Sequence, residues 1–419
     1  MGKLRKEAIG THLSLITDYH SNGSYESLKD HVTLLDEKDY AIIIRTLNFE
    51  RNDFTKDLLY VDKDAYDFLS KSYVLPNDIL MNKIANPGNV YIMPDLACPV
   101  TCGMNLFLMR FDDEVNQRYM YYNMKNVEAY IKSFSHGTTT KTITKDDVRG
   151  IEIFVHERED QDRIEKVLST IDAKIDADRQ LIEKLSDLLH LLYERWFMEY
   201  EFPVKGKDKA TYRSSGNELV WDSTIKRKIP AGWKVIPLNE RFTFDRGVEV
   251  GADNYSDERQ EGYASYYRVS DMDAECITYV DETLLNDTFL RREDVCVSFD
   301  GTVGKVSFGL EGGYSSGIRK IEDKEGVLNN AFMYTFFTSD YAQFVIDKFA
   351  TGSNILHSSE SINNLFIAYN EGVYKDFVEL ITPIFNRMLE AKKDLDKWNK
   401  TKEILLPALM NGQIVVVPK

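Results

Sequence analysis

Local sequence patterns in the N-terminal half of the chain recur in the same order in the C-terminal half. The patterns are an apolar run that contains an arginine, two short apolar runs joined by a glycine-bearing loop, and a polar loop with a central glycine. They lie at 43–48, 78–90 and 134–139, and again at 266–271, 294–306 and 349–354. The offset between the copies is nearly the same for all three patterns. This shared order predicts two copies of one structural unit.

A fourth pattern is a heptad seam, in which apolar residues alternate in steps of three and four, and it predicts a long helix in each half. Any two amphipathic helices share this period, so the seam alone leaves coincidence open, and only the common order of four patterns favours a repeat. The polar positions Asp178 and Lys402 either fix the register of the helices or lie at a helix edge. The seam residues are Leu168, Ile171, Ile175, Ile182, Leu185, Leu189, Leu192 and Trp196, and then, in the second half, Ile381, Ile384, Met388, Ala391, Leu395, Trp398, Leu405 and Leu409.

These patterns predict an α/β (α+β) fold with two tandem globular domains, each followed by a long helix. A polar, basic and turn-rich stretch between the halves is expected to be a connector. The expected boundaries are 1–157 for the first domain, 158–200 for the central helix, 201–228 for the connector, 229–372 for the second domain, 373–412 for the distal helix and 413–419 for the tail.

The composition is that of a globular protein. Of the 419 residues 43% are hydrophobic, which is enough for two or three cores, and the four cysteines are too few for a disulfide framework. No run of 18 apolar residues and no apolar signal segment occurs, so we expect a cytoplasmic protein without a membrane span. The 68 acidic and 52 basic residues give a net charge of −16. This charge disfavours a polyanionic partner unless basic groups are gathered locally or come from a partner subunit.

The chain lacks the sequence motifs of common catalytic and metal sites. The glycine-bearing stretch at 301–306 is too short for a phosphate-binding loop, and neither Gly-x-Ser-x-Gly nor His-Glu-x-x-His occurs. Cys98 and Cys102 could supply half of a metal site, but no second close pair of cysteine or histidine residues completes it. We therefore expect no catalytic residue, no metal and no cofactor in this chain, and a binding function is favoured by elimination.

Four stretches are specific enough to compare with a known family. The second half carries Glu293-Asp294-Val295 and a loop that ends in Gly304-Lys305-Val306, and it begins with Ile229-Pro230-Ala231-Gly232-Trp233. The seams end in Leu192-Tyr193-Glu194-Arg195-Trp196-Phe197 and in Leu405-Leu406-Pro407-Ala408-Leu409-Met410-Asn411-Gly412. With these motifs the chain resembles, over nearly its whole length, the specificity (S) subunits of type I restriction–modification enzymes. The first half departs from the pattern, because it lacks the Pro-x-Gly-Trp phrase.

The resemblance implies a non-catalytic DNA-recognition subunit. Its two target-recognition domains would read the halves of an interrupted site in double-stranded DNA. The two long helices would pair as an antiparallel coiled coil and hold the domains at a fixed distance. It would dock modification subunits that methylate adenine N6 and, for cleavage, motor-nuclease subunits, and S-adenosylmethionine, ATP and Mg²⁺ would belong to those partners. The seam from Leu168 to Trp196 would span roughly 43 Å at about 1.5 Å per residue. That length slightly exceeds one turn of B-DNA, about 34–36 Å.

Candidate DNA-binding residues are the polar side chains of the repeated loops, because they can hydrogen bond to base edges. Ordinary turn chemistry is the alternative for any one of them, and a structural ion pair is the alternative for the two arginines. The candidates are Arg45, Lys83, Asn86, Asn89, Thr138, Thr139, Thr140 and Lys141 in the first half, and Arg268, Asp300, Thr302, Lys305, Ser315, Ser316, Arg319, Ser353 and Asn354 in the second.

Two other classes of function remain open. A coiled-coil scaffold that binds only proteins would have no target DNA. An acidic DNA mimic would carry carboxylates in rows at phosphate-like spacing, whereas here the carboxylates are dispersed and the loops are rich in asparagine, threonine and serine. The target bases and the spacer between them follow no linear code in the sequence.

Overall fold

The computed structural model describes residues 4–138, 140–206, 209–273, 276, 278–352 and 356–416. The chain divides into two compact units, Met1–Lys174 with Trp398–Lys419, and Ile175–Lys397. Both divisions fall inside long helices, so each unit contains part of α7 and part of α11. Helices and strands are mixed in both units, as the sequence predicts. Within the described ranges, no helix is both long and apolar enough to cross a membrane.

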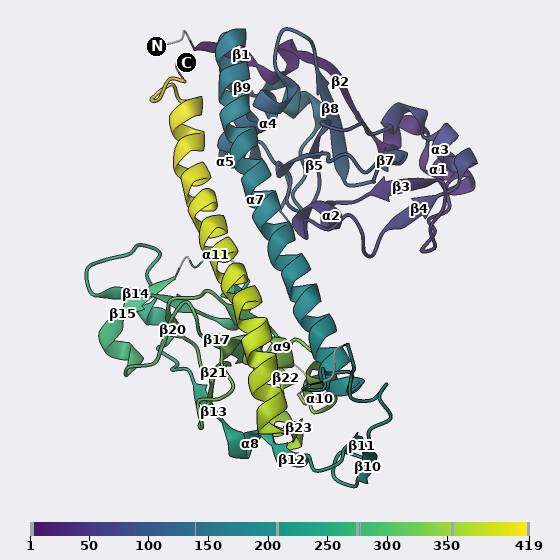
Figure 1. Ribbon diagram of the computed structural model, residues 1–419. Coiled ribbons are helices and arrows are strands. Elements are labelled where there is room, and N and C mark those ends of the chain that lie inside the picture. Colours follow the sequence, from purple (N-terminus) through teal and green to yellow (C-terminus); the bar gives the residue numbers. More distant parts are fainter. Residues whose placement is uncertain are drawn as a thin grey trace. The chain divides into compact units, whose positions relative to one another are not determined.

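In the part of the first unit that the structure describes, the strands form three small sheets (Figure 1). An antiparallel sheet has the order β2-β8-β5-β6, a second has the order β4-β3-β7 with β3 parallel to β7, and β1 pairs with β9. The strands are β1 (Arg5–Ala8), β2 (Leu13–Asp18), β3 (Ala41–Ile44), β4 (Leu59–Val61), β5 (Ile79–Asn82), β6 (Val90–Ile92), β7 (Val100–Cys102), β8 (Leu106–Phe111) and β9 (Glu152–Val155). The helices are α1 (Tyr25–His31), α2 (Thr46–Glu50), α3 (Lys63–Phe68), α4 (Gln117–Asn126), α5 (Glu128–Lys132) and α6 (Lys145–Gly150).

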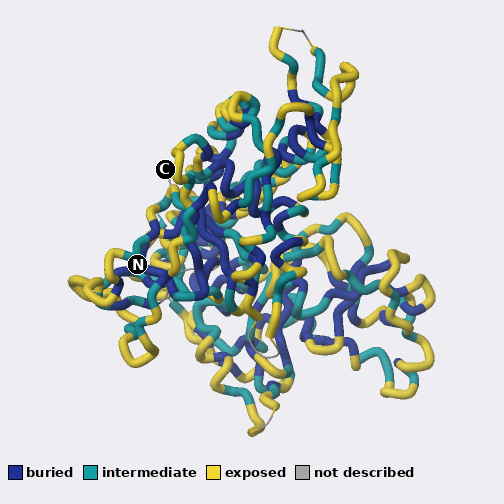
Figure 2. Tube along the Cα trace, turned by 90° about the horizontal axis from the view of Figure 1, so that it is seen from below, coloured by how far each residue is buried: buried dark blue, intermediate teal, exposed yellow. Residues whose placement is uncertain are grey.

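Strand β5 lies at the centre of this unit and is buried on both faces. Ile79 and Met81 belong to the core cluster that includes residues of α4, whereas Leu80, which points to the opposite face, belongs to the cluster that contains Ile42 and Ile44 of β3. Burial on both faces accounts for the three consecutive apolar residues Ile79, Leu80 and Met81 of the strand. Figure 2 shows that buried and exposed stretches alternate along the chain.

The described residues of the second unit form two four-stranded sheets and three two-stranded ones. The orders are β13-β21-β17-β19 and β15-β14-β20-β16, and the pairs are β12-β23, β18-β22 and β10-β11. The strands are β10 (Leu219–Asp222), β11 (Arg227–Pro230), β12 (Lys234–Pro237), β13 (Phe242–Arg246), β14 (Tyr263–Tyr267), β15 (Tyr279–Asp281), β16 (Phe289–Leu290), β17 (Val295–Ser298), β18 (Asp300–Gly301), β19 (Val306–Phe308), β20 (Gly312–Tyr314), β21 (Ile318–Asp323), β22 (Leu356–His357) and β23 (Phe366–Tyr369). The helices are α8 (Leu238–Arg241), α9 (Asn330–Phe337) and α10 (Asp340–Lys348). Strand β10 begins at Leu219, inside the stretch expected to be a connector.

The strand pairings of the two units correspond. The three adjacent strands β6-β5-β8 have counterparts in β19-β17-β21, and the parallel pair β3-β7 has a counterpart in β14-β20. Ile79 pairs with Ile92, and Val295 pairs with Phe308, so one sequence offset relates both partners of the first pair to those of the second. Like β5, β17 alternates between two clusters, with Val295 in one and Cys296 in the other.

The long helices are α7 (Arg158–Tyr193), which passes into a π-helical turn at Glu194–Met198, and α11 (Glu371–Met410). In the first unit, Leu168 of α7 and Leu409 of α11 belong to one core cluster. In the second unit, Leu189 of α7 and Ile381 of α11 do the same. Early residues of α7 are therefore clustered with late residues of α11, and late residues of α7 with early residues of α11.

Lys402, the polar position of the second seam, makes specific contacts within the first unit. Its Nζ atom lies 2.5 Å from Asp172 Oδ1 of α7 and 5.7 Å from the centroid of the Tyr122 ring. Tyr122 Oη donates a hydrogen bond of 2.6 Å to the other oxygen of Asp172. Lys402 thus links α11 to α7 and α4 by a half-buried ion pair, and it does not lie at a free helix edge.

Candidate nucleic-acid interface

Two loops of the first unit, which the sequence marks as repeated, pair with each other. We call the segments 83–89 and 134–143 the first loop pair. The Ala85 amide donates to the Lys141 carbonyl at 3.0 Å, and the Ile143 amide donates to the Lys83 carbonyl at 3.0 Å. His136 and Thr142 exchange both backbone hydrogen bonds, at 2.7 and 2.8 Å. Backbone bonds therefore hold the candidate residues of these two segments in one place.

The side chains of the first loop pair differ in exposure. Asn89 is half-buried, and Thr139 lies outside the described residues. Amide and hydroxyl groups at an exposed loop can donate to and accept from base edges, so this surface has the chemistry that direct readout needs. The exposed candidates are Asn86, Thr138, Thr140 and Lys141.

Lys83 differs from this group, because its side chain is buried. Its Nζ atom lies 2.5 Å from Asp18 Oδ2 of β2, and Lys145 Nζ lies 2.8 Å from the other oxygen. Burial alone would raise the pKa of Asp18, but the hydrogen bonds from Lys145 and Lys83 outweigh burial and hold that pKa far below its ordinary value. Burial and the charge of Lys83 lower the pKa of the adjacent His20. Lys83 supports the loop from inside and does not reach its surface.

Arg45 follows β3 and is half-buried. Its backbone amide donates to Asn48 Oδ1 at 3.0 Å, which caps α2, and its Nη2 atom donates to the Asp57 carbonyl at 2.5 Å. The neighbouring Thr46 hydroxyl donates to Asn82 Oδ1 at 2.7 Å, at the end of β5. Asn82 in turn exchanges backbone hydrogen bonds with Asn89 and Gly88. The turn after β3 is thereby tied to the base of the first loop pair.

The second unit contains an equivalent arrangement of segments 299–305 and 351–358, which we call the second loop pair. Asp300 and Gly301 pair with His357 and Leu356 as β18 and β22. Thr351 and His357 exchange backbone hydrogen bonds of 3.0 and 2.8 Å, as His136 and Thr142 do in the first unit.

The base of the second loop pair also matches that of the first. The amides of Ser298 and Gly304 donate to the carbonyls of Lys305 and Ser298, at 2.9 and 2.8 Å. In the first unit the amides of Asn82 and Gly88 donate to Asn89 and Asn82 at 2.9 and 2.8 Å. One constant sequence offset relates each partner to its counterpart, so the two loops share one backbone framework and differ in the side chains that they carry.

The candidates of the second loop pair and of the neighbouring turn at 315–319 differ in how deeply their side chains are buried. Thr302 is exposed, whereas Asp300, Lys305 and Ser316 are half-buried. The side chains of Ser315 and Arg319 are buried, and both lie at the start of β21 or just before it. Ser353 and Asn354 lie outside the described residues.

Asp300 joins the two segments of the second loop pair through its side chain. His357 Nδ1 lies 2.6 Å from Asp300 Oδ1, and Arg319 Nη2 lies 3.5 Å from Oδ2. Arg319 also donates to the Ser316 carbonyl and, at 3.2 Å, to the Ile318 carbonyl. Burial lowers the pKa of Arg319, and Asp300 opposes that effect. The buried guanidinium therefore supports the loop, and His357 is a polar residue at this surface that the sequence patterns did not single out.

Arg268 and Lys305 both have acidic partners. Arg268 Nε lies 2.7 Å from Asp271 Oδ2, and the amide of Arg268 donates to the same carboxylate at 3.1 Å, so the structural ion pair expected as the alternative is present. The hydrogen bond to Asp271 raises the pKa of Arg268. Lys305 Nζ lies 2.8 Å from Asp273 Oδ2 and 3.3 Å from the Val269 carbonyl. Both cations remain partly exposed, with 39% and 21% of the side chain accessible.

The chain is similar to specificity subunits of known type I restriction enzymes. Residues 27–187 match the family model described as the type I restriction modification DNA specificity domain. The MjaIX specificity subunit of Methanocaldococcus jannaschii is 22% identical over 351 residues, which cover 81% of this chain and 78% of that one. The HindI specificity subunit of Haemophilus influenzae is 19% identical over 416 residues, which cover 85% of this chain and 83% of that one.

The fold is similar to that of a solved S subunit. The crystal structure of the type I restriction–modification S subunit from M. genitalium matches with a TM-score of 0.57 at 14% identity and covers 100% of this chain and 97% of that one. The family model and the two relatives confirm the resemblance that the sequence motifs indicate, namely to the specificity subunits of type I restriction–modification enzymes.

Proposed function

We propose that this chain reads a bipartite, interrupted target in double-stranded DNA as the sequence-specificity subunit of a type I restriction–modification enzyme. The observation that carries the proposal is the presence of two matching loop pairs, one in each unit, with the same backbone hydrogen bonds. A common framework with different side chains is suited to two half-sites of different sequence. Asn86 in the first loop pair and Thr302 in the second are exposed, and both side chain types bond to base edges.

The proposed DNA contacts are the candidates whose side chains reach the surface. Lys83, Ser315 and Arg319 are buried and are assigned to the support of the loops. Arg45 and Arg268 follow corresponding strands and are assigned to phosphate contacts, which position a protein without reading sequence. The proposed base-reading set is Asn86, Asn89, Thr138, Thr140, Lys141, Asp300, Thr302, Lys305 and Ser316.

We also propose that the two units are copies of one recognition module, and that α7 and α11 pair as an antiparallel coiled coil that fixes the distance between half-sites. The corresponding strand pairings support the first statement. The second is supported by the core contacts, in which Leu168 is clustered with Leu409 in one unit and Leu189 with Ile381 in the other. The ion pair between Lys402 and Asp172 would help to fix the register, as a polar residue in an apolar seam can.

The acidic charge of the chain is consistent with DNA binding only if partner subunits supply much of the positive charge. We propose that methyltransferase subunits clamp the DNA, bind S-adenosylmethionine and methylate adenine N6, and that motor-nuclease subunits use ATP and Mg²⁺. This chain would contribute recognition and no catalytic step, in the cytoplasm. The long helices carry exposed apolar side chains, including Leu191 and Ile404, each 60% accessible, and a docked subunit would cover them.

Methylome sequencing tests this function. The chain is expressed with its cognate methyltransferase subunit, and the host DNA is searched for N6-methyladenine. We expect the modified base in a motif of two short specific parts separated by an unspecific spacer. A stable complex that leaves no such motif would contradict the proposal and would favour a scaffold that binds only proteins.

A further inference from the structure

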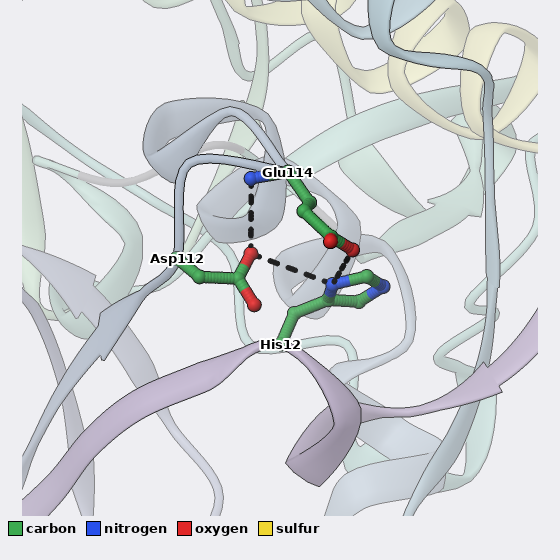
Figure 3. Close-up of side chains that lie close together, drawn as sticks. All are labelled: His12, Asp112 and Glu114. Carbon is green, nitrogen blue, oxygen red and sulfur yellow. Dashed lines mark hydrogen bonds and ion pairs between the residues drawn. The ribbon is translucent and has the colours of Figure 1, made fainter.

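His12, Asp112 and Glu114 meet at one end of the strand pair β2-β8 in the first unit (Figure 3). His12 immediately precedes β2, and Asp112 immediately follows β8. The two strands are antiparallel, with Leu13 opposite Phe111, so these ends are adjacent. The Asp112 amide donates to the His12 carbonyl at 2.8 Å. The sheet register therefore brings together side chains that are far apart in the sequence.

The imidazole of His12 is buried, yet one of its nitrogen atoms has no hydrogen-bond partner. His12 is only 5% exposed, and among the described residues nothing bonds to Nδ1. Asp112 Oδ1 lies 3.5 Å from Nδ1, and Glu114 Oε2 lies 3.8 Å from it. These separations are longer than ordinary hydrogen bonds, and a buried polar atom without a partner is both rare and costly. Figure 3 shows Nδ1 directed toward the two carboxylates.

The other ring nitrogen is held by a third carboxylate. His12 Nε2 lies 2.6 Å from Glu7 Oε2 of β1. With the proton on Nε2, the ring donates to Glu7, and the lone pair of Nδ1 faces Asp112 and Glu114. Metal-binding histidines commonly donate their second N–H to a carboxylate in this way, which fixes both the tautomer and the orientation of the ring.

We propose that His12 Nδ1, Asp112 Oδ1 and Glu114 Oε2 bind one divalent transition-metal ion of the Zn²⁺ type. Ligands at about 2.0–2.2 Å from a tetrahedral Zn²⁺ ion are roughly 3.4 Å apart. The separations of 3.5 and 3.8 Å from Nδ1 are close to that value. An imidazole ligand favours Zn²⁺ and related ions over Mg²⁺ and Ca²⁺, which prefer oxygen ligands alone.

The site is open to metal from solution and would join two parts of the chain. The Glu114 side chain is 81% exposed and that of Asp112 is 37% exposed, so an ion has access and water can fill a remaining position. A bound ion would fasten the segment before β2 to the turn after β8. Among the described residues a second histidine–carboxylate group lies around His190. We do not propose a metal site there, because His190 is only half-buried, with 29% of its side chain accessible.

The alternative occupant of the space is a proton. A doubly protonated His12 would form ion pairs with Glu7, Asp112 and Glu114 and would bind no metal. The metal-bound arrangement predicts saturable binding in a metal titration, whereas the protonated arrangement predicts no binding.

The test is a titration of the full chain, freed of metal with EDTA and dialysed, with Zn²⁺ by calorimetry and with Co²⁺ by visible absorption. We expect one saturable equivalent, tetrahedral Co²⁺ bands and a higher Tm with Zn²⁺. Glu114→Gln changes an exposed side chain and should fold normally, and it should weaken binding at least about tenfold. His12→Gln should abolish binding. Asp113→Asn, an exposed neighbour of the two carboxylate ligands, and His190→Gln are the matched controls and should bind as the unaltered chain does.

Absence of saturable binding would overturn the proposal in favour of the protonated arrangement. Equal metal binding by the unaltered chain and Glu114→Gln would also overturn it, because the ion would then bind at another place. If His12→Gln does not fold, the comparison of Glu114→Gln with Asp113→Asn decides. Metal binding requires neither DNA nor a partner subunit, so its failure would leave the proposed reading of DNA unaffected.

Discussion

Lys83 and Asp18 form a buried ion pair, with 2.5 Å between the ammonium Nζ and the carboxylate Oδ2. The pair joins the first loop pair to the end of β2, and Lys145 and Ser21 bond to the other carboxylate oxygen. Lys83 belongs to a loop with exposed polar groups, but its own side chain is held in the interior by this ion pair. The exposed surface of the first loop pair is formed instead by side chains such as those of Asn86 and Thr140.

Replacement of Lys83 by methionine should destabilise the first unit. The substitution keeps the aliphatic stem but leaves the buried Asp18 carboxylate with Lys145 as its one remaining cationic partner, and removal of one partner of a buried pair costs about 3 kcal/mol. Urea unfolding followed by circular dichroism, with the transition of each unit resolved, measures the change. Lys141→Met, in the opposite segment of the same loop pair, is the control because Lys141 is exposed, and it should leave the transition in place.

Acid should weaken the first unit through Asp18. The folded-state pKa of Asp18 is depressed, so its contribution to stability is complete above the ordinary value of 3.8 and is lost as the pH falls below that value. Asp18→Asn should therefore be much less stable than the unaltered chain near neutral pH, and the difference should narrow in acid. Urea midpoints measured for both proteins at about pH 6 and about pH 3 test this. If the difference in urea midpoint between the two proteins is the same at both pH values, the depressed pKa assigned to Asp18 is contradicted.

The ion pair between Lys402 and Asp172 should stabilise the contact of α11 with α7 in the first unit. Lys402→Met removes the 2.5 Å contact and leaves the half-buried Asp172 with the Tyr122 hydroxyl, which should cost about 1–2 kcal/mol. Chemical unfolding of the first unit is the measurement. Lys400→Met, two residues away and exposed, should change little. Equal effects of the two substitutions would show that the pair contributes no specific stability.

Lys305→Ala and Arg268→Ala should weaken DNA binding by the assembled methyltransferase complex without unfolding the chain. If Lys305 contacts phosphate, its loss should reduce the slope of log K against log salt by about 1 and should weaken all sequences alike. If it reads a base, the loss should be about 1–3 kcal/mol for the target alone. Fluorescence anisotropy at several salt concentrations distinguishes the two. Lys228→Ala, an exposed lysine of the hairpin β10-β11, is the control. Unchanged affinity for both loop variants would refute these contacts.

The free chain should bind its target poorly at physiological salt, because a net charge of −16 repels phosphate. Addition of the methyltransferase subunit should restore tight binding, measured by the same anisotropy assay. Tight, salt-sensitive binding by the chain alone would contradict the view that partner subunits supply most of the positive charge.

The repeated sequence patterns coincide with loops whose backbone hydrogen bonds correspond in the two units. The offset that aligns the two glycine-bearing loops also aligns hydrogen-bonded positions, such as Asn82 and Asn89 with Ser298 and Lys305. The same patterns predicted long helices close to the observed α7 and α11, because a heptad seam depends only on near neighbours in the chain.

The features that the sequence does not predict depend on contacts between residues that are distant along the chain. Lys83 is buried because Asp18 and Lys145 lie beside it, and no local pattern reveals those partners. The group around His12 follows no sequence motif of fixed spacing for the same reason, because the register of β2 with β8 brings His12 to Asp112.

The most direct test of DNA reading by two separate modules is an exchange of residues 231–372 for the corresponding residues of a relative with a different target. The exchanged chain is expressed with the methyltransferase subunit, complex formation is checked, and the methylome is sequenced. The account predicts that one half of the interrupted motif changes while the other half is kept. An assembled complex that still methylates the original motif, or that never produced a two-part motif, would contradict it.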